Sequence, residues 1–472
     1  MTPTAQDSNN LTARGPLLMV RGMPRLVRTA LIVALALGLA GSGSLDAAAQ
    51  PSVERDPGAQ AALQMPERPA VEPEAIPEDE PFGREIDFYD PSGHALRPFH
   101  DALRATQSEE DPRKARVLVY GASHVAADFF TNVLRERLQS RFGDAGHGFL
   151  MPARPWRRYR HLGGLSVESN RPWDALRVRA STRDVDHLGV AGLAVESDDR
   201  RAFGRIDTGD QVASQFAIMY LEQPGGGSFD VRLDGRRVAR IATAAEETGA
   251  GWRLITAAEA RHVLEIRPRG DGPVRLFGVS VEREQPGVII DNLGINGARA
   301  VSHLYWDAAL HTEYLRRLSP DLVVLAYGTN ESGDDGHPIE TYEEELRAVV
   351  GRVRGAVPGA ACMLIGPSDR PMRGEEGELV DRPRTHQVVE VQRRVSRDMG
   401  CAFFDLVAFG GGPLSMPHWA EADPPFAQRD HVHYTGRGYL RLGEVLHGAM
   451  LEGFDAAPRF DPPAAVAAGP RP

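Results

Sequence analysis

Cysteine is scarce in this sequence, and its scarcity excludes several classes of protein. The chain of 472 residues contains two cysteines, Cys362 and Cys401. Two are too few for a disulfide-rich scaffold or for a zinc site built from several cysteines. Both lie on or beside candidate strands, where we expect buried free thiols; a disulfide between them is the alternative.

Positive charge is also in short supply. Lysine and arginine number 54 against 65 aspartate and glutamate residues, which gives a formal net charge of −11, and Lys114 is the only lysine. No arginine cluster stands out, so the sequence lacks the basic face that a nucleic-acid-binding protein needs, and we predict no nucleic-acid partner. With 42% apolar and 25% charged residues, most of the chain is able to fold around a core. Its length suits two domains plus tails.

A hydrophobic run long enough to cross a membrane is missing near the N-terminus. The apolar run Ala30–Ala40 has 11 residues, whereas a spanning helix needs about 20. Arginines precede the run and small residues follow it up to Ala49, the order found in a secretory signal. We therefore expect residues 1–49 to be a signal peptide region and the protein to be periplasmic or extracellular. A membrane anchor is the alternative if the segment stays uncleaved.

Two further segments have compositions that do not favour a packed core. Residues 50–84 are rich in proline and glutamate, so we predict a disordered linker. Residues 456–472 are rich in proline and alanine, and we predict a second disordered segment there.

The remaining chain contains apolar strand candidates that alternate with amphipathic helix candidates. This alternation predicts an α/β domain with a parallel sheet covered on both faces, built from residues 85–154 and 287–455. The predicted strands are Arg116–Tyr120, Val288–Asn292, Leu322–Tyr327, Met363–Gly366 and Ala402–Leu406. The predicted helices are a continuous helix ending at Phe142, then Ala298–Leu318, Tyr342–Val353, Thr385–Asp398 and Gly436–Gly453.

Residues 155–286 show a different pattern, with short strand candidates separated by glycine-rich turns. This pattern leaves little room for helix and predicts an inserted all-β domain, most simply a sandwich or jelly roll. The candidate strands are Leu188–Val195, Phe216–Leu221, Phe229–Leu233, Val238–Ile241, His262–Ile266 and Val274–Val281.

Polar residues cluster where the predicted strands end, which is where an open α/β sheet binds its ligands. Gly121–His124 follows the first strand, Asn292–Gly297 the second and Gly328–Glu331 the third, while Asp430–His433 precedes the last helix. Each stretch alone is compatible with an ordinary turn.

The four stretches together contain the groups that an acyl-transfer reaction requires. It needs a nucleophile, a base, a group that orients the base, and donors for an oxyanion. Asp430 and His433 are spaced to place a carboxylate behind an imidazole facing Ser123. Gly297 can offer a backbone N–H and Asn330 a side-chain amide, so the sequence predicts a serine acyl-transfer site.

These four stretches, over residues 115–150 and 288–450, resemble the blocks of the SGNH, or GDSL-type, hydrolases. The resemblance implies a flavodoxin-like three-layer α/β/α sandwich. It implies Ser123 as nucleophile, His433 as general base and Asp430 as its orienting carboxylate. It also implies an oxyanion hole formed by the Ser123 N–H, the Gly297 N–H and the Asn330 side chain, with no metal or organic cofactor.

A narrower resemblance concerns the inserted strands and the stretch Ser123–Phe149, which are similar to peptidoglycan O-acetylesterases. This resemblance implies a carbohydrate-binding role for the insert. The implied function is an exported esterase that removes O-acetyl groups from an acetylated polysaccharide, peptidoglycan being the first candidate. A carbohydrate O-acetyltransferase, a general carboxylesterase or lipase, and a non-catalytic carbohydrate-binding protein are the alternatives.

Some residues leave questions open. Ala122 stands where the family usually has aspartate, and in the non-catalytic alternative it would mark a decayed site. Because every group with a chemical step is present, we expect the site to be active. His124 is expected either to line the site or to face solvent. Glu331 and Asp334–Asp335 are expected on a polar surface loop. His431 is expected to face solvent beside His433, the alternative being a metal site formed by the two.

Overall fold

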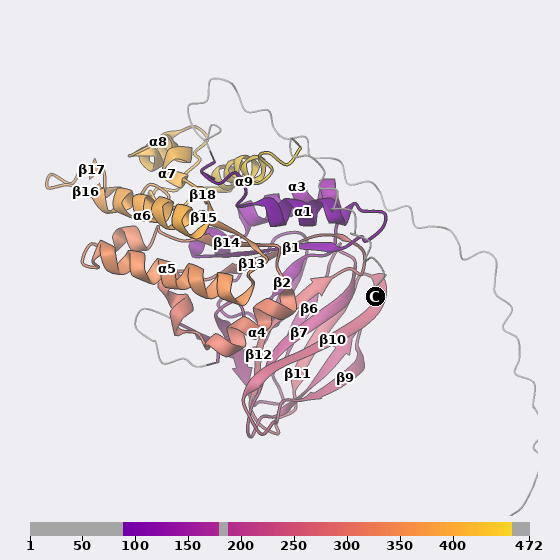
Figure 1. Cartoon of the computed structure of the whole chain (residues 1–472). Helices are drawn as coiled ribbons and strands as arrows, with labels where there is room; N and C mark the ends of the chain where they lie inside the picture. Colours follow the sequence, from indigo (N-terminus) through magenta and orange to yellow (C-terminus); the bar gives the residue numbers. More distant parts are fainter. Residues whose placement is uncertain (1–87, 179–186, 456–472) are drawn as a thin grey trace, which may run out of the picture. The chain divides into compact units, whose positions relative to one another are not determined.

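The computed structural model describes residues 88–178 and 187–455 (Figure 1). The predicted signal region at 1–49, the linker at 50–84 and the tail at 456–472 lie outside the described residues. Within those residues, no helix combines the length and apolar character needed to cross a membrane.

A five-stranded parallel sheet forms the centre of the α/β part, as predicted. Its strands stand in the order β13-β1-β14-β15-β18, and every neighbouring pair is parallel. Numbered by their order along the chain, these strands run 2-1-3-4-5, the flavodoxin-like order. The bounds are β1 Lys114–Gly121, β13 Gly287–Gly294, β14 Leu322–Ala326, β15 Ala361–Ile365 and β18 Ala402–Phe404.

Two helical layers cover the two faces of the parallel sheet (Figure 1). Alternating side chains of its strands pack on these two layers. On β1, Val117 and Val119 join the hydrophobic cluster that includes α1, α3 and α9, whereas Leu118 and Tyr120 join the cluster on the opposite face. The first layer contains α1 Arg97–Thr106, α3 Phe129–Phe142 and α9 Gly436–Met450, and the opposite face is covered by α4 Ala308–Leu318, α5 Ile339–Ala356 and α6 Pro383–Met399. Shorter elements are α2 Ser123–Ala126, η1 Ala300–Tyr305, η2 Glu331–Gly333, α7 Leu406–Gly410, α8 Ser415–Glu421, β16 Met372–Arg373 and β17 Leu379–Val380.

Two helices predicted as continuous are interrupted. The helix ending at Phe142 breaks between α2 and α3 at Asp128, which has a φ of 56° and whose carboxylate serves contacts outside the helix. The helix predicted over Ala298–Leu318 divides into η1 and α4 because Asp307 caps α4, accepting the Leu310 N–H at 2.8 Å.

Residues between α3 and β13 form two antiparallel sheets. One has the order β10-β7-β12-β5-β4 with β2 beside β12, and the other β3-β6-β11-β8-β9. A single hydrophobic cluster continues from the parallel sheet into these strands, so the core has no break at the predicted boundary. The first sheet contains β2 Gly148–Leu150, β4 Asp174–Arg177, β5 Leu193–Ser197, β7 Ala213–Glu222, β10 Gly249–Ala260 and β12 Val274–Glu282; the second contains β3 Ser166–Ser169, β6 Gly204–Asp207, β8 Ser228–Leu233, β9 Arg236–Ala242 and β11 Val263–Pro268.

The sequence analysis misplaced the start of this region and the start of one of its strands. The predicted start at residue 155 missed β2, which pairs with β12 through Leu150 and Val279. The strand predicted from Leu188 begins at Leu193, because the Gly192 N–H bonds the Gly189 carbonyl in a turn where Gly192 has a φ of 67°.

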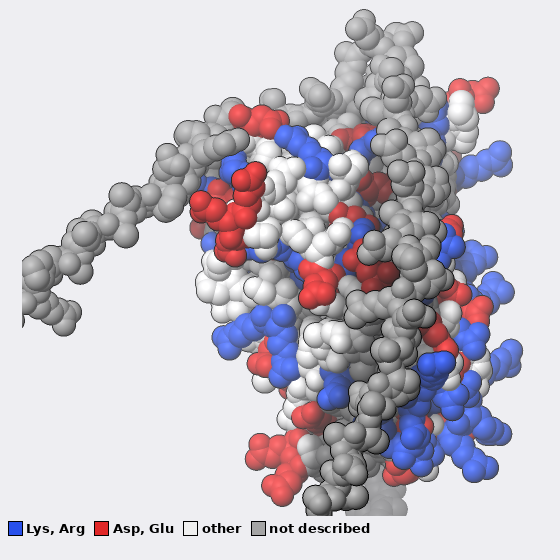
Figure 2. All heavy atoms as spheres, turned by 90° about the vertical axis from the view of Figure 1, so that its right-hand side faces the viewer, with Lys and Arg blue, Asp and Glu red and all other residues white. Residues whose placement is uncertain are grey.

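Charged side chains on the antiparallel strands are paired with neighbours across the sheet. Arg240 on β9 lies 2.7 Å from Asp230 on β8, and Arg205 on β6 lies 3.1 Å from Glu265 on β11. Figure 2 shows one face of the molecule, on which acidic and basic side chains are interspersed and basic ones gather toward the lower right.

The two cysteines form a disulfide, so the preference for free thiols was wrong. Cys362 lies on β15 and Cys401 precedes β18, the neighbouring parallel strand, and their Cα atoms are 4.6 Å apart. Strand register brings the two residues opposite each other, which sequence separation alone does not indicate.

Two buried histidines lie on the α4 side of the sheet. His303 bonds the Tyr327 hydroxyl at 3.1 Å and His311 bonds the Tyr120 hydroxyl at 3.2 Å; both histidines are fully buried. Burial, helped by the charge of Arg352, lowers the pKa of His311 to about 3, and burial also lowers the pKa of His303. Both rings are therefore neutral in the folded protein.

Replacing Cys362 and Cys401 by alanine should lower the free energy of unfolding by about 3–4 kcal/mol, because the disulfide closes a segment of 39 residues. Urea unfolding of the two single variants and the double variant tests this. Either single change removes the whole cross-link, so all three should lose similar stability. Losses that add up in the double variant would contradict it.

The free energy of unfolding should also fall between about pH 7.5 and pH 5.5. An unfolded histidine has a pKa near 6.5, so in this range the unfolded chain binds protons that folded His303 and His311 do not. Each such histidine costs about 1.4 kcal/mol at pH 5.5. Urea unfolding at the two pH values measures the fall, and His311→Gln should reduce it by about that amount. An equal fall in variant and wild type would refute the interpretation.

Candidate active site

Ser123 stands at the carboxyl end of β1, where the chain turns sharply into α2. Gly121 ends the strand and Ser123 is the first residue of α2. A Cβ on Gly121 would lie 2.7 Å from the Ala326 carbonyl oxygen of β14, so this close passage requires glycine. Ala122 between them is buried, with 6% of its surface exposed. The turn therefore has a small buried residue where the related blocks carry aspartate.

A polar cluster below this turn attaches α2 to the end of β13. The Asn292 amide donates to the Val125 carbonyl and to the Asp128 carboxylate, both at 2.8 Å. The other oxygen of Asp128 accepts the Leu162 N–H at 2.6 Å. Because Asp128 is 1% exposed, these bonds form without competition from water. They hold the segment that carries Ser123 in one place.

Ser123, His433 and Asp430 form a continuous chain of hydrogen bonds. His433 Nε2 lies 2.8 Å from Ser123 Oγ, and His433 Nδ1 lies 2.8 Å from Asp430 Oδ2. The second oxygen of Asp430 accepts the backbone N–H groups of Val432 and His433, each at 3.0 Å. One carboxylate thus shapes the turn and orients the imidazole that the turn carries.

The protonation states of the three hydrogen-bonded residues suit proton transfer from the serine. Partial burial alone would raise the pKa of the Asp430 carboxyl, but hydrogen bonds from His433 and Val432 hold its pKa below the ordinary value. An ionised carboxylate only accepts, so Nδ1 of His433 carries the ring proton and Nε2 accepts the Ser123 hydroxyl. This is the tautomer in which an imidazole can serve as a general base.

His124 is buried behind the triad, so the solvent-facing alternative is wrong. Its ring bonds the Tyr439 hydroxyl at 2.9 Å and the Ser368 hydroxyl at 3.3 Å, with its centroid 5.5 Å from that of His433. Burial, together with the nearby His433, lowers the pKa of His124 to about 3. The neutral ring packs beside His433 without opposing a positive charge on it.

Gly297 and Asn330, the predicted oxyanion donors, lie on two loops that are bonded to each other. Gly297 has a φ of 78°, which favours glycine, and a Cβ there would meet nothing within 4 Å. Asn330 donates one amide hydrogen to the Ala298 carbonyl at 2.9 Å, which leaves its second amide hydrogen for another acceptor. The Ile295 N–H bonds the Gly121 carbonyl at 2.9 Å, so the Gly297 loop begins beside the nucleophile turn.

Glu331 is a buried clamp between these loops and not the surface residue that we expected. Its carboxylate accepts the Ala300 N–H at 2.8 Å and the Gly328 N–H at 3.0 Å, with 5% of the residue exposed. Burial raises the pKa of this carboxyl, while the backbone donors oppose the rise. Asp334, also expected at the surface, receives both Nε and a terminal nitrogen of Arg299 at 2.5 Å. We call the bonds of Asn330, Glu331 and Asp334 to residues 298–300 the loop clasp.

Ser368 was missed by the sequence analysis, although a signal existed. It follows β15, so it lies at a strand end like the other site residues. Its N–H donates to the Thr329 hydroxyl at 3.2 Å, and its hydroxyl donates to the Val432 carbonyl at 3.4 Å. It connects the Asn330 loop with the loop of His433.

His431 lies on the turn between Asp430 and His433 and has a φ of 54°. Over residues 88–178 and 187–455, no group of three His, Cys, Asp or Glu side chains is arranged to hold a metal ion.

Comparisons with known proteins find a similar family and similar solved structures. Residues 255–441 match the GDSL-like lipase/acylhydrolase family, a range that contains Gly297, Asn330, Asp430 and His433 but not Ser123. No curated protein sequence matches the chain significantly.

A solved structure matches a larger share of the chain. A structure of a peptidoglycan O-acetylesterase is 25% identical, covers 78% of this chain and 99% of its own, and has a TM-score of 0.64. Family two carbohydrate esterases from Cellvibrio japonicus and Clostridium thermocellum are each 12% identical. They cover 62% and 61% of this chain and 98% and 99% of their own, with TM-scores of 0.25 and 0.26, too low to support an argument. The family match over residues 255–441 and the likeness to the peptidoglycan O-acetylesterase structure support an SGNH-type, or GDSL-type, hydrolase that acts on carboxylic esters.

Proposed function

We propose that this protein is an exported serine esterase that removes O-acetyl groups from a cell-wall polysaccharide, with peptidoglycan as the first candidate. The observation that carries the proposal is the unbroken hydrogen-bond chain from Asp430 through His433 to Ser123. A decayed site would have no reason to keep three side chains from distant segments in this alignment.

The first half-reaction transfers the acetyl group to the enzyme. His433 Nε2 removes the Ser123 proton as Oγ attacks the ester carbonyl, and Asp430 stabilises the imidazolium that forms. The Ser123 and Gly297 N–H groups and the Asn330 amide would bind the oxyanion. When the bond from the carbonyl carbon to the sugar oxygen breaks, His433 returns the proton to that oxygen.

The second half-reaction regenerates the enzyme. Water, deprotonated by His433, attacks the acetyl-serine, and acetate leaves as Ser123 recovers its proton. Transfer to a second sugar would follow the same path with a hydroxyl in place of water. None of these steps draws on a metal or organic cofactor.

The substrate and the location are inferred from the likeness to a solved structure and from the N-terminal sequence. The 25%-identical structure is that of a peptidoglycan O-acetylesterase, which favours an acetylated polysaccharide. The sequence of residues 1–49 favours export, which would bring the enzyme to the cell wall.

Acetate release by the full chain tests this function. O-acetylated peptidoglycan, acetylated xylan and an aryl acetate are compared, each with wild type and with Ser123→Ala. Release that depends on Ser123 and is fastest with peptidoglycan supports the proposal. Release only from the aryl acetate favours a general carboxylesterase. Binding of the polymer without any release favours the non-catalytic alternative.

Ser123→Ala and His433→Ala should each reduce kcat by at least about 10³-fold, because each removes a group that the chemical step requires. Asp430→Asn should be less damaging, since nucleophile and base remain in place. Aryl acetate hydrolysis measures all three, and thermal unfolding checks the fold. Wild-type activity in Ser123→Ala would exclude the assignment.

Glu331→Gln should lower kcat by about 10²-fold, as expected when oxyanion donors are displaced. Glutamine would turn an amide N–H₂ toward a backbone N–H of Gly328 or Ala300, so the clasp would lose one bond. Asp335→Asn is the control, because Asp335 is exposed, lies just after η2 near Glu331 and pairs with Arg382, the residue before α6. If Glu331→Gln lowers Tm but keeps the wild-type kcat, the loop clasp contributes to stability and not to catalysis.

A further inference from the structure

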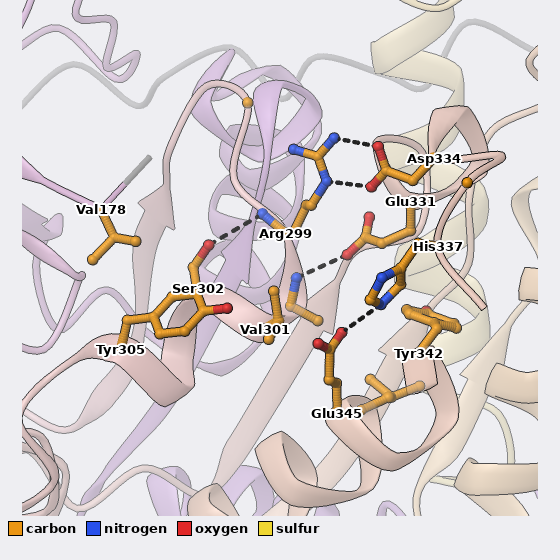
Figure 3. Close-up of a pocket in the computed structure, with 14 residues that line it drawn as sticks. Val178, Arg299, Val301, Ser302, Tyr305, Glu331, Asp334, His337, Tyr342 and Glu345 are labelled. Atoms are coloured by element: carbon orange, nitrogen blue, oxygen red, sulfur yellow. Dashed lines mark hydrogen bonds and ion pairs between the residues drawn. The ribbon is translucent and has the colours of Figure 1, made fainter. Parts of the chain in front are cut away.

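A pocket of about 410 Å³ opens beside Gly297, next to the proposed oxyanion hole (Figure 3). Its walls come from the loop that continues into η1, from the loop after η2 and from the start of α5. Val178, just after β4, closes another side. A molecule bound here would therefore adjoin the reacting ester. The volume far exceeds that of an acetyl group, so the acyl part of an acetate ester leaves it unfilled.

The charged groups in the pocket are already satisfied by one another. Arg299 is paired through two nitrogens with Asp334, and His337 Nε2 lies 3.0 Å from Glu345 Oε2 (Figure 3). Glu331 is held by two backbone N–H groups. An anionic ligand would have to displace Asp334 from Arg299 and would face three carboxylates against one guanidinium. The pocket thus disfavours carboxylates and sulfates.

The rest of the lining suits a sugar ring. Val178, Val301 and the Tyr305 ring offer apolar surface on which the C–H groups of a pyranose can pack. The carboxylates of Asp334 and Glu345 have oxygen lone pairs that their ion pairs do not use. These lone pairs can accept hydrogen bonds from the hydroxyl groups of a sugar. A long acyl chain would remove water from the same carboxylates without offering them a hydrogen-bond donor in its place, which disfavours its binding.

We propose that this pocket is a subsite for a neutral, hydroxyl-rich sugar ring on the alcohol side of the ester. It would select acetylated neutral glycans over acetylated polyuronates and would not accept long acyl chains. The proposal rests on the esterase function proposed above and assigns a part of the substrate to the pocket.

Val301→Trp, which fills the pocket, tests the assignment. We expect kcat/KM for an acetylated neutral polysaccharide to fall at least about tenfold more than kcat/KM for 4-nitrophenyl acetate, mainly through KM. Val238→Trp is the matched control, because Val238 is 47% exposed on β9 and outside the pocket. Equal losses on both substrates, or a loss specific to 4-nitrophenyl butyrate, would overturn the proposal; the second result would place the acyl chain in the pocket.

Charge selection gives a second test that does not depend on the folding of Val301→Trp. Wild type should release acetate at least about tenfold faster from acetylated xylan than from acetylated alginate, a polyuronate. Glu345→Gln removes one carboxylate that repels the polyuronate, so the ratio of the xylan rate to the alginate rate should fall toward one. Added salt should also lower this ratio, because it screens the repulsion. A wild-type ratio near one, or one that Glu345→Gln leaves unchanged, would reject the proposal.

A binding measurement separates this inference from the esterase function. Ser123→Ala is titrated with neutral xylo-oligosaccharides, with and without Val301→Trp. Binding that weakens with Val301→Trp supports the subsite even if the wild-type chain releases no acetate. Binding that is indifferent to Val301→Trp counts against the subsite even if the esterase is active.

Discussion

The hydrogen bond that the Ser123 hydroxyl donates to His433 joins residues 310 positions apart, and the other contacts of the site hold its length near 2.8 Å. Neither residue is positioned by its sequence neighbours alone. Ser123 is placed by the end of β1 and by the bonds of Asn292 to α2. His433 is placed by Asp430 within its own turn. Proton transfer is sensitive to small displacements, so the serine and the imidazole both need these fixed supports.

Buried ionic contacts connect the parallel sheet with the antiparallel strands behind it. Arg116 on β1 bonds Asp291 on β13 at 2.7 Å and also Glu282 at the end of β12. Burial alone would lower the pKa of Arg116, but the two carboxylates raise it, and the pKa of Glu282 falls to about 2 despite its own burial. Arg116 and Glu282 therefore stay ionised, whereas burial raises the pKa of the Asp291 carboxyl against the opposing charge of Arg116. Removing one would leave an uncompensated buried charge, so the junction tolerates little change.

The sequence analysis succeeded where the evidence is local. The five core strands are continuous apolar runs, and their order of appearance with intervening helices permits few topologies. Errors arose where hydrogen bonds interrupt an apolar pattern. Asp128 and Asp307 break helices because their carboxylates accept backbone N–H groups, and hydrophobic spacing does not record such bonds. A backbone hydrogen bond in the Gly189–Gly192 turn moved one strand boundary.

The loop clasp shows the same limit within the site. Glu331 follows a strand and a glycine turn, a context in which a carboxylate is usually solvated. Only the folded chain brings the Ala300 and Gly328 N–H groups together around it. His124 likewise became a buried neutral residue because Tyr439 and Ser368 surround it.

The sequence by itself determined the chemical identities in the right order: a serine after the first strand, glycine and asparagine after later strands, and Asp430 three residues before His433. These depend on spacing within one turn or on the rule that parallel strands end at one edge of the sheet. The tertiary structure decided which groups are buried and which are paired, including the disulfide of Cys362 with Cys401 and the paired charged side chains of the pocket beside Gly297. Burial and pairing are properties of contacts between distant segments, and such contacts exist only once the chain has folded.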